Sequence, residues 1–323
     1  MSALVKPLKR FPHCFESTIG GGLRKYSGKL PRLESLTVNI LPPPIDSWTS
    51  PPGDVGDVFI DAPDLRKVIL HGVIERGSFA FPSQITHLAA SFSAIHNLHT
   101  HSLLEELHLE EWYDDDFDFP RRITLPKVRR LSVSSLNVLR YLCLPSLEDL
   151  TCGRYFTGLT LFAPRYTDAR VAGVIMRDFL HSSHCSLTSL ATNSSFVDAS
   201  DFFRETLPLL ESLTSLAFVI DKDSERWFYD TLMSPNILPN LQCLVMRLPP
   251  DGMEDISQDT LSAMLASRGQ HLLSVTIECP YMPYYDNVII LERLQPLRKV
   301  GVDVRADSSM LRDSIGIEFG QFA

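Results

Sequence analysis

The sequence has no uninterrupted apolar run long enough to cross a bilayer, and residues 1–22 lack the apolar core of a secretory signal peptide. It also lacks paired cysteines, because its six cysteines are spread singly along 323 residues with no CxxC spacing. Such a distribution is typical neither of a disulfide framework nor of a zinc finger. We therefore expect reduced thiols, no membrane association and a cytoplasmic or nuclear location.

Basic charge and catalytic motifs are scarce as well. The 30 Lys and Arg residues are outnumbered by 39 Asp and Glu residues, which gives a net charge of −9 and disfavours nucleic-acid binding. No P-loop, no GxSxG and no GxGxxG after a strand occurs, and the triplet Gly20, Gly21 and Gly22 lacks the strand–helix context of a phosphate loop. The sequence predicts a protein that is not an enzyme and needs no cofactor.

What is abundant is a three-position apolar pattern: one apolar residue, two variable residues, a second apolar residue, one variable residue and a third apolar residue. The second and third apolar positions are two residues apart, so on a β-strand they share one face. Eleven copies follow one another: Leu33/Leu36/Val38, Leu65/Val68/Leu70, Ile85/Leu88/Ala90, Leu104/Leu107/Leu109, Val128/Leu131/Val133, Leu147/Leu150/Cys152, Leu187/Leu190/Thr192, Leu213/Leu216/Phe218, Leu241/Leu244/Met246, Leu272/Val275/Ile277 and Leu297/Val300/Val302.

The spacing of these copies indicates a repeat architecture. Successive middle residues are 19 to 40 positions apart, and most intervals lie near the roughly 20–29 residues of a leucine-rich repeat. A proline stands two residues before the first apolar position in five copies, namely Pro31, Pro63, Pro126, Pro145 and Pro239. The predicted fold is an α/β leucine-rich-repeat solenoid with a curved parallel β-sheet on its concave side.

The connectors are predicted to change along the chain. Residues 1–29 form an irregular N-terminal segment or partial cap, residues 30–305 the solenoid, and residues 306–323 a C-terminal tail or cap. Short intervals early in the chain predict extended or single-turn connectors on the convex side. Later intervals predict helices that pack on the sheet through apolar stripes. These helices are expected from 167–168 onward with Val174, Ile175 and Phe179, then over 198–210, over 224–233 with Trp227 and Leu232, over 255–268 and over 286–294.

The concave sheet face is the predicted binding surface. Small residues occupy the row between the ladder positions, and polar or charged residues flank that row, so a large partner can approach the backbone. The alternative is that these are ordinary surface residues without a role. The candidate protein-binding residues on the strands are His71, Glu106, His108, Glu110, Arg130, Arg247, Glu278 and Asp303.

An acidic and aromatic stretch at residues 110–119 has the most unusual composition in the chain. It contains Trp112 and Tyr113, which we add to the candidate protein-binding residues because exposed aromatic side chains are good anchors at interfaces. The other interpretation is a solvated loop whose aromatic side chains fold back onto the rim of the solenoid.

Five histidines gather in one part of the sequence, at His87, His96, His99, His101 and His108. The His99-x-His101 pair has the ligand type that zinc accepts. However, no cysteine lies nearby, and Glu105 and Glu106 are the only close carboxylates. Ordinary loop and surface histidines explain the cluster better, and no metal site is predicted.

Several phrases resemble the leucine-rich-repeat region of the F-box proteins of mushroom-forming fungi. They are LPRLESLTV at 30–38, APDLRKVIL at 62–70, FPSQITHL at 81–88, ITLPKVRRLSV at 123–133, LPSLEDL at 144–150, MRDFLHSSHCSLTSL at 176–190 and LPNLQCL at 238–244. The likeness covers residues 28–305. It implies a repeat region that selects the target of a cullin ubiquitin ligase, to which an F-box docks through a Skp-type adaptor.

Residues 1–29 show no F-box pattern, so the resemblance implies the target-recognition half alone. The predicted function is a non-catalytic protein–protein recognition module with a protein target on the concave face. A Skp-type adaptor is not an expected partner of this chain. The alternative is a free-standing leucine-rich-repeat scaffold or an inhibitor-like binding protein without any connection to a ligase. An in-frame F-box upstream would favour the first of these two possibilities.

Overall fold

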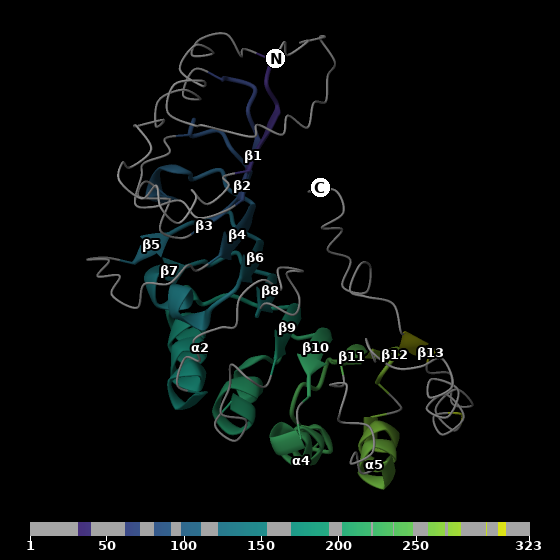
Figure 1. The fold of residues 1–323 in the computed structure, drawn as a ribbon. Helices are drawn as coiled ribbons and strands as arrows, with labels where there is room; N and C mark the ends of the chain where they lie inside the picture. Colours follow the sequence, from purple (N-terminus) through teal and green to yellow (C-terminus); the bar gives the residue numbers. More distant parts are fainter. Residues whose placement is uncertain are drawn as a thin grey trace, which may run out of the picture. The chain divides into compact units, whose positions relative to one another are not determined.

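The chain has an α/β fold built on parallel β-sheet (Figure 1). The structure, a computed structural model, describes residues 32–39, 62–71, 81–91, 98–110, 122–153, 169–193, 202–220, 222–234, 236–247, 258–268, 271–278, 295 and 303–307. The chain divides into two compact units. Unit 1 comprises Met1–Leu131 and Tyr141–Ser146, and unit 2 comprises Ser132–Arg140 and Leu147–Ala323.

Unit 1 is a parallel sheet with short connectors. Its strands are β1 (Ser35–Asn39), β2 (Lys67–His71), β3 (His87–Ser91), β4 (Glu106–Glu110) and the first residues of β6 (Arg130–Val133), in that order. The connectors contain the 3-10 turn η4 (Leu98–Thr100) and the paired two-residue strands β5 (Ile123–Thr124) and β7 (Leu142–Cys143). The expected extended and single-turn connectors are therefore confirmed for the described residues.

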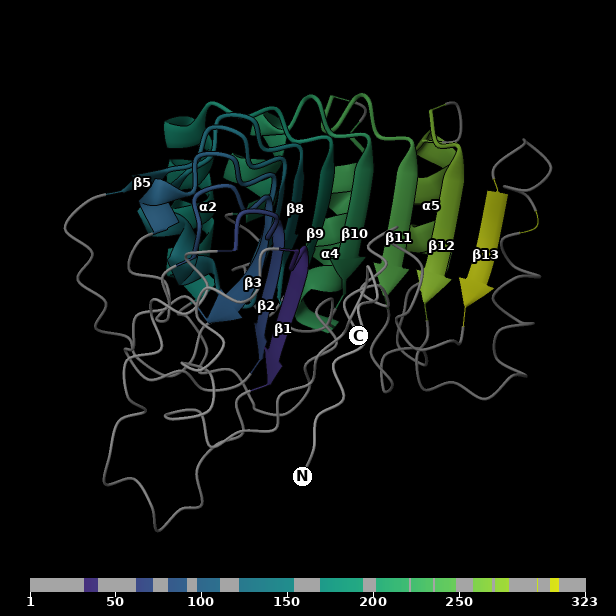
Figure 2. The ribbon, with the colours of Figure 1, turned by 90° about the horizontal axis from the view of Figure 1, so that it is seen from above.

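Unit 2 combines parallel strands with helical connectors. Its strands follow in the order β8 (Asp149–Cys152), β9 (Ser189–Asn193), β10 (Ser215–Val219), β11 (Cys243–Arg247), β12 (Ser274–Glu278) and β13 (Asp303–Asp307). The connectors include α2 (Ala169–Ser183), α4 (Lys222–Leu232), α5 (Gln258–Arg268), the π-turn η8 (Phe202–Thr206), and the 3-10 turns η9 (Leu207–Leu209) and η5 (Leu136–Tyr141), of which η5 ends at the unit boundary. Helices α4 and α5 lie on the same side of strands β10 to β12 (Figures 1 and 2).

The predicted apolar ladder forms the core. The middle residues stand opposite one another in the pairings that the structure gives, as with Leu36 and Val68 in unit 1 or Leu216 and Leu244 in unit 2. Leu107 and Leu216 are each 1 % exposed, so the expected inward face is confirmed. Cys152 also lies in the core, and burial raises the pKa of its thiol.

One hydrogen-bond pattern recurs at the starts of β2, β3, β4, β6, β9, β10, β11 and β12. The carbonyl oxygen just before one strand accepts the N–H groups of two successive residues at the start of the next strand. In unit 1, the Arg66 carbonyl accepts from Thr86 at 2.8 Å and from His87 at 3.0 Å. In unit 2, the Thr188 carbonyl accepts from Thr214 at 2.9 Å and from Ser215 at 3.0 Å. The start of one strand thereby fixes the register of the next.

The recurring proline has a precise place in this pattern, the second position of a β-turn. Leu65 donates its N–H to the Ala62 carbonyl at 3.1 Å, with Pro63 following Ala62, and Leu241 donates to the Leu238 carbonyl at 3.1 Å around Pro239. Proline favours this turn position because its fixed φ matches the turn. The turn delivers the first apolar residue to the core.

A buried arginine closes the connector between α4 and β11. Arg268, at the end of α5, is 3 % exposed. Its guanidinium donates to the carbonyl oxygens of Leu232 at 2.6 Å, Leu238 at 3.0 Å and Ser234 at 2.5 Å, and also to that of Ile237. The Arg268 side chain thus supplies donors to carbonyl groups at and after the C-terminal end of α4, where no further helical turn follows to supply them.

Three expectations about the helical connectors were wrong in detail. Val174 in α2 is 43 % exposed, while Ile175 and Phe179 beside it are buried. Trp227 in α4 is 39 % exposed, and the Arg204 guanidinium lies 5.1 Å from its ring centroid. The segment predicted as one helix over 198–210 holds η8 and η9 instead within its described part, and Pro208 lies in the first turn of η9.

The eleventh rung was also predicted in the wrong register. The triplet Leu297/Val300/Val302 lies outside the described residues, and strand β13 places Val304 opposite Val275. The predicted helix over 286–294 lies outside the described residues too. Among the helices that the structure describes, none combines the length and the apolarity needed to traverse a bilayer.

Candidate functional site

A row of charged side chains crosses the sheet of unit 1. Lys67, His87, Glu106 and Arg130 each stand directly before the buried middle residue of their strand, so they face the side of the sheet opposite the core. Pairing sets Lys67 opposite His87 and His87 opposite Glu106. Arg130 begins β6 by donating its N–H to the Glu105 carbonyl at 3.2 Å. We call these four residues the charged row.

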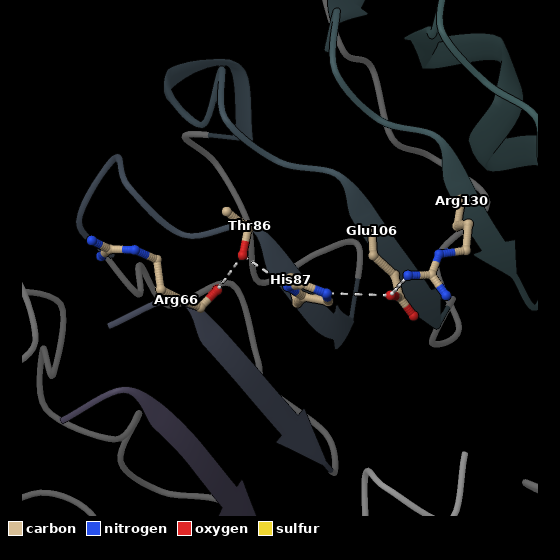
Figure 3. A network of polar contacts seen from close by, with 5 residues as sticks. All are labelled: Arg66, Thr86, His87, Glu106 and Arg130. Atoms are coloured by element: carbon tan, nitrogen blue, oxygen red, sulfur yellow. Dashed lines mark hydrogen bonds and ion pairs between the residues drawn. The ribbon is translucent and has the colours of Figure 1, made fainter. Parts of the chain in front are cut away.

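Glu106 is the centre of the charged row (Figure 3). Its Oε2 lies 3.0 Å from Nη2 of Arg130 and 3.5 Å from Nε2 of His87. The exposed fraction of the side chain is 17 % for Glu106, 33 % for His87 and 53 % for Arg130. The carboxylate is therefore enclosed by its neighbours, while the guanidinium keeps much of its surface open to solvent.

Lys67 joins the row from strand β2. Burial lowers the pKa of its ammonium group, and the negative charge of Glu106 acts in the opposite direction. Glu106 therefore interacts electrostatically with a lysine two strands away as well as with its direct partners. With Lys67 and Arg130 at its ends and one carboxylate between them, the row has an excess of positive charge in a protein that is acidic as a whole.

His87 connects the row to the backbone of the preceding repeat through Thr86. The Thr86 Oγ1 lies 2.8 Å from Nδ1 of His87 and 3.3 Å from the carbonyl oxygen of Arg66 (Figure 3). The hydroxyl has one proton, so it donates either to a neutral His87 or, when Nδ1 carries a proton and donates to Thr86, to the Arg66 carbonyl. Nε2 of His87 lies 3.5 Å from Oε2 of Glu106 and can donate to it whenever Nε2 carries a proton.

The side chains of Thr86, His87 and Glu106 form a series of contacts from a hydroxyl to an imidazole to a carboxylate, as in hydrolytic triads. Its surroundings do not suit that chemistry, because the Thr86 hydroxyl faces the carbonyl oxygen of Arg66. When a hydroxyl attacks a substrate, negative charge develops on the substrate oxygen, and hydrogen-bond donors are needed to stabilise it. A carbonyl oxygen at this place would repel that charge. The Arg66 guanidinium points away from the network, toward the Pro63 carbonyl at 2.8 Å (Figure 3). These contacts orient His87 on the face of the sheet opposite the core.

Some predicted binding residues meet in unit 1. Glu106 and Arg130 are in direct contact, and the half-buried His108 lies on the same face of β4, opposite Ala89 of β3. The side chains of His71, Glu110 and Glu278 lie outside the described residues, although their backbones belong to β2, β4 and β12. Trp112 and Tyr113 lie outside the described residues altogether.

Two predicted binding residues of unit 2 are placed differently from expectation. Arg247 was expected on the open surface, but it is only 4 % exposed, and its carbonyl accepts from the Ile220 N–H at 2.9 Å. Asp303 is exposed and pairs with Ser274, so it lies in the row directly before the middle residues. It was expected in the row three positions after them.

Sequence reasoning left Lys67, His87 and Thr86 out of the candidate set. Lys67 and His87 hold the same position in their repeats as Glu106 and Arg130, so a consistent use of the row would have selected both. The sequence signal for Thr86 was weaker than that for Lys67 and His87, because threonine is common before a strand. Only the structure shows that its hydroxyl contacts the imidazole of His87. Thr188 and Thr214 of unit 2 hold the equivalent position and donate to the preceding carbonyl as well.

The two histidines considered for zinc, His99 and His101, differ in their exposure to solvent. His99 is exposed, whereas His101 is 2 % exposed and its pKa is lowered by burial and, to a lesser extent, by His99. Within the described part of the chain, no group of three or more His, Cys, Asp or Glu side chains is arranged to hold a metal ion.

No family model, no curated protein and no solved structure matches the chain. The resemblance to the fungal F-box repeats therefore stays a prediction. The charged row and the repeated parallel strands are the features that point to a function.

Proposed function

We propose that the chain is a non-catalytic protein-recognition module whose open sheet face binds a partner protein. The observation that carries this proposal is the charged row, four side chains held in one line across β2, β3, β4 and β6. Charged side chains that are fixed by their neighbours but exposed on one side give complementarity to a partner at little cost of ordering.

We further propose that the strands are the rungs of a leucine-rich-repeat solenoid. The support is the repeated β-turn, the repeated carbonyl that accepts two N–H groups, and the pairing of strands in sequence order within each unit. A solenoid of this kind covers one face of its sheet with connectors and leaves the other face to partners. The charged row belongs to the face opposite the buried ladder, where such a partner would bind.

The resemblance to F-box repeats supports a role in choosing the target of a ubiquitin ligase. A free-standing scaffold or inhibitor-like protein uses the same surface and remains the alternative. An in-frame F-box in the genomic sequence upstream would favour the ligase receptor.

Affinity capture with a charge-reversed variant tests the binding proposal. Arg130→Glu reverses the most exposed charge of the row, and Lys127→Glu makes the same reversal at an exposed turn residue just before β6. We expect proteins that are captured by the native chain and by Lys127→Glu but lost by Arg130→Glu. Identical sets of captured proteins for all three chains would show that the row does not bind the partner.

A further inference from the structure

We propose that the charged row selects an extended segment of the partner with the pattern acidic–x–basic–x–acidic, running across the strands. This inference rests on the proposed function, because it names the chemistry that the same surface accepts. Three properties of the row carry it: the spacing of its two cationic ends, the carboxylate between them, and the absence of charge at the neighbouring positions of β2 and β3.

The spacing fits an extended chain. Lys67 and Arg130 stand on β2 and β6, with β3 and β4 between them. Three strand spacings amount to about 14 Å, and residues i and i+4 of an extended chain are about 13 Å apart. Side chains i, i+2 and i+4 point the same way on such a segment. Its first and fifth residues can therefore meet the two ends of the row, while the third lies between His87 and Glu106, from where a long side chain can reach the carboxylate.

The ends of the row favour acidic partner residues. The Arg130 side chain is 53 % exposed while it contacts Glu106, and a guanidinium offers five donors in a planar fork. A carboxylate of the partner can bind this fork at the exposed edge. Lys67, at the other end, presents a second positive charge on the same face.

The centre of the row favours a basic partner residue. An acidic side chain placed there would meet the carboxylate of Glu106, whereas a lysine or arginine would be attracted to it. The carboxylate of Glu106 also disfavours nucleic acids as partners, because a nucleic-acid strand has a phosphate on every nucleotide and would place one against Glu106. The alternating pattern of the row therefore fits a mixed-charge peptide better than a uniform polyanion.

The neighbouring positions on β2 and β3 are uncharged. Two residues further along β2 and β3 stand Ile69 and Ala89, which are 2 % and 9 % exposed. Neither side chain carries a charge that would compete with the row. A partner segment can therefore meet Lys67 and His87 without a competing charge on β2 or β3.

Two labelled peptides of identical composition provide the test. The first has the core Glu-Ser-Lys-Ser-Glu, and the second has the core Glu-Ser-Glu-Ser-Lys. Fluorescence anisotropy with the full chain measures both affinities at low salt. We expect the first peptide to bind at least about tenfold more tightly. Arg130→Glu should remove that preference, and Lys127→Glu should leave it within about twofold.

A charge-swapped peptide guards against misfolding of the variant. The core Glu-Ser-Lys-Ser-Lys should bind Arg130→Glu more tightly than it binds the native chain, which a merely unfolded variant would not show. Equal affinities of the two first peptides, no binding at about millimolar concentration, or displacement by a single-stranded oligonucleotide would overturn the inference. If capture of partner proteins still depends on Arg130, the pattern fails and the recognition surface stands; if that dependence is also absent, the proposed function fails with it.

Discussion

Units 1 and 2 are built on the same strand pattern but differ in the residues they show on the open face. The position before the middle residue carries Lys67, His87 and Glu106 on β2 to β4 of unit 1. On β9 to β12 of unit 2, the same position carries Ser189, Ser215, Cys243 and Ser274. In the same row of unit 2, Asp149 on β8 and Asp303 on β13 flank these four residues. A common backbone register thus supports a row of mixed charge in unit 1 and, in unit 2, a row of small residues between two aspartates.

The next row strengthens this contrast. In unit 2, Ala191, Ala217 and Val219 form a small apolar cluster, and Val245 packs against it. The equivalent row of unit 1 is apolar at Ile69 and Ala89 as well, and it differs by the half-buried His108 opposite Ala89. The charged row that we propose as a binding surface belongs to unit 1. The repeated strand supplies the same scaffold in both units, while single positions supply the chemistry.

The opposite faces differ through their connectors. The described connectors of unit 1 are a short 3-10 turn and two-residue strands, whereas unit 2 places helices against its sheet. In unit 2, the rings of Phe218 on β10 and Phe228 on α4 stack with centroids 5.0 Å apart. The core of unit 2 thus depends on helix-to-sheet contacts that the described connectors of unit 1 do not make.

The largest expected effect tests that dependence. Phe228→Ala removes a side chain with no exposed surface and should cost about 3–5 kcal/mol in the free energy of unfolding, measured with urea. The matched control is its neighbour Trp227, 39 % exposed, whose replacement by alanine should cost about 1 kcal/mol or less. Equal losses for both variants would mean that α4 does not pack on β10 as described.

The ladder itself should matter equally in the two units. Leu131→Ala and Leu216→Ala each remove a middle residue that is at most 2 % exposed. Each should cost about 2–5 kcal/mol in denaturant titrations, because truncation leaves a cavity in a packed core. A loss within about 0.5 kcal/mol at either site, as at ordinary surface positions, would separate the cores of the two units.

The stability of the protein at low pH should depend on the buried imidazole of His101 in unit 1. Burial lowers the pKa of His101 below its usual value near 6.5, so the unfolded chain takes up this proton at a higher pH than the folded chain. The contribution is present above about pH 6.5 and is lost as the pH falls through the lower folded-state pKa. Leucine occupies the equivalent position, three residues before the first apolar residue, at Leu144 and Leu238. His101→Leu should therefore be tolerated and should reduce the acid sensitivity of unfolding. An unchanged pH profile would contradict this origin.

The smallest expected effect concerns the charged row. Glu106→Gln should lower the free energy of unfolding by about 1 kcal/mol or less, because partly exposed ion pairs contribute little to stability. Ser215→Ala at the equivalent position of unit 2 should change it by no more than about 0.5 kcal/mol. Thermal or urea denaturation measures both. A much larger loss for Glu106→Gln would mean that the row holds unit 1 together and is not kept for binding.

The apolar pattern was sufficient to predict the strands because burial acts on every repeat in the same way. Leu36, Leu107 and Leu216 are buried at the positions that the pattern assigned to them. The last strand was predicted four residues too early, since the Asp303 N–H bonds to the Leu273 carbonyl at 3.0 Å and pairing with β12 sets its register. An apolar triplet cannot reveal a register imposed by a neighbouring strand.

Helical stripes and polar contacts were less predictable for a different reason. A helix turns by about 100° per residue, so a one-residue error moves a side chain such as Trp227 from the core to the surface. The Thr86–His87 contact depends on side-chain torsions that no spacing determines. The positions of Glu106 and Arg130 were predictable from the strand register, but the enclosure of Glu106 by its neighbours was not.

The carbonyl that accepts two N–H groups at each strand start has a consequence for how such a chain can change in evolution. Each repeat receives the next one through the same acceptor, as with Arg66 in unit 1 and Thr188 in unit 2. An in-frame duplication or loss of one whole repeat therefore meets a compatible acceptor and compatible donors on both sides of the junction. The gene can lengthen or shorten its array without new interfaces, and selection is then free to act on single exposed positions such as that of Arg130.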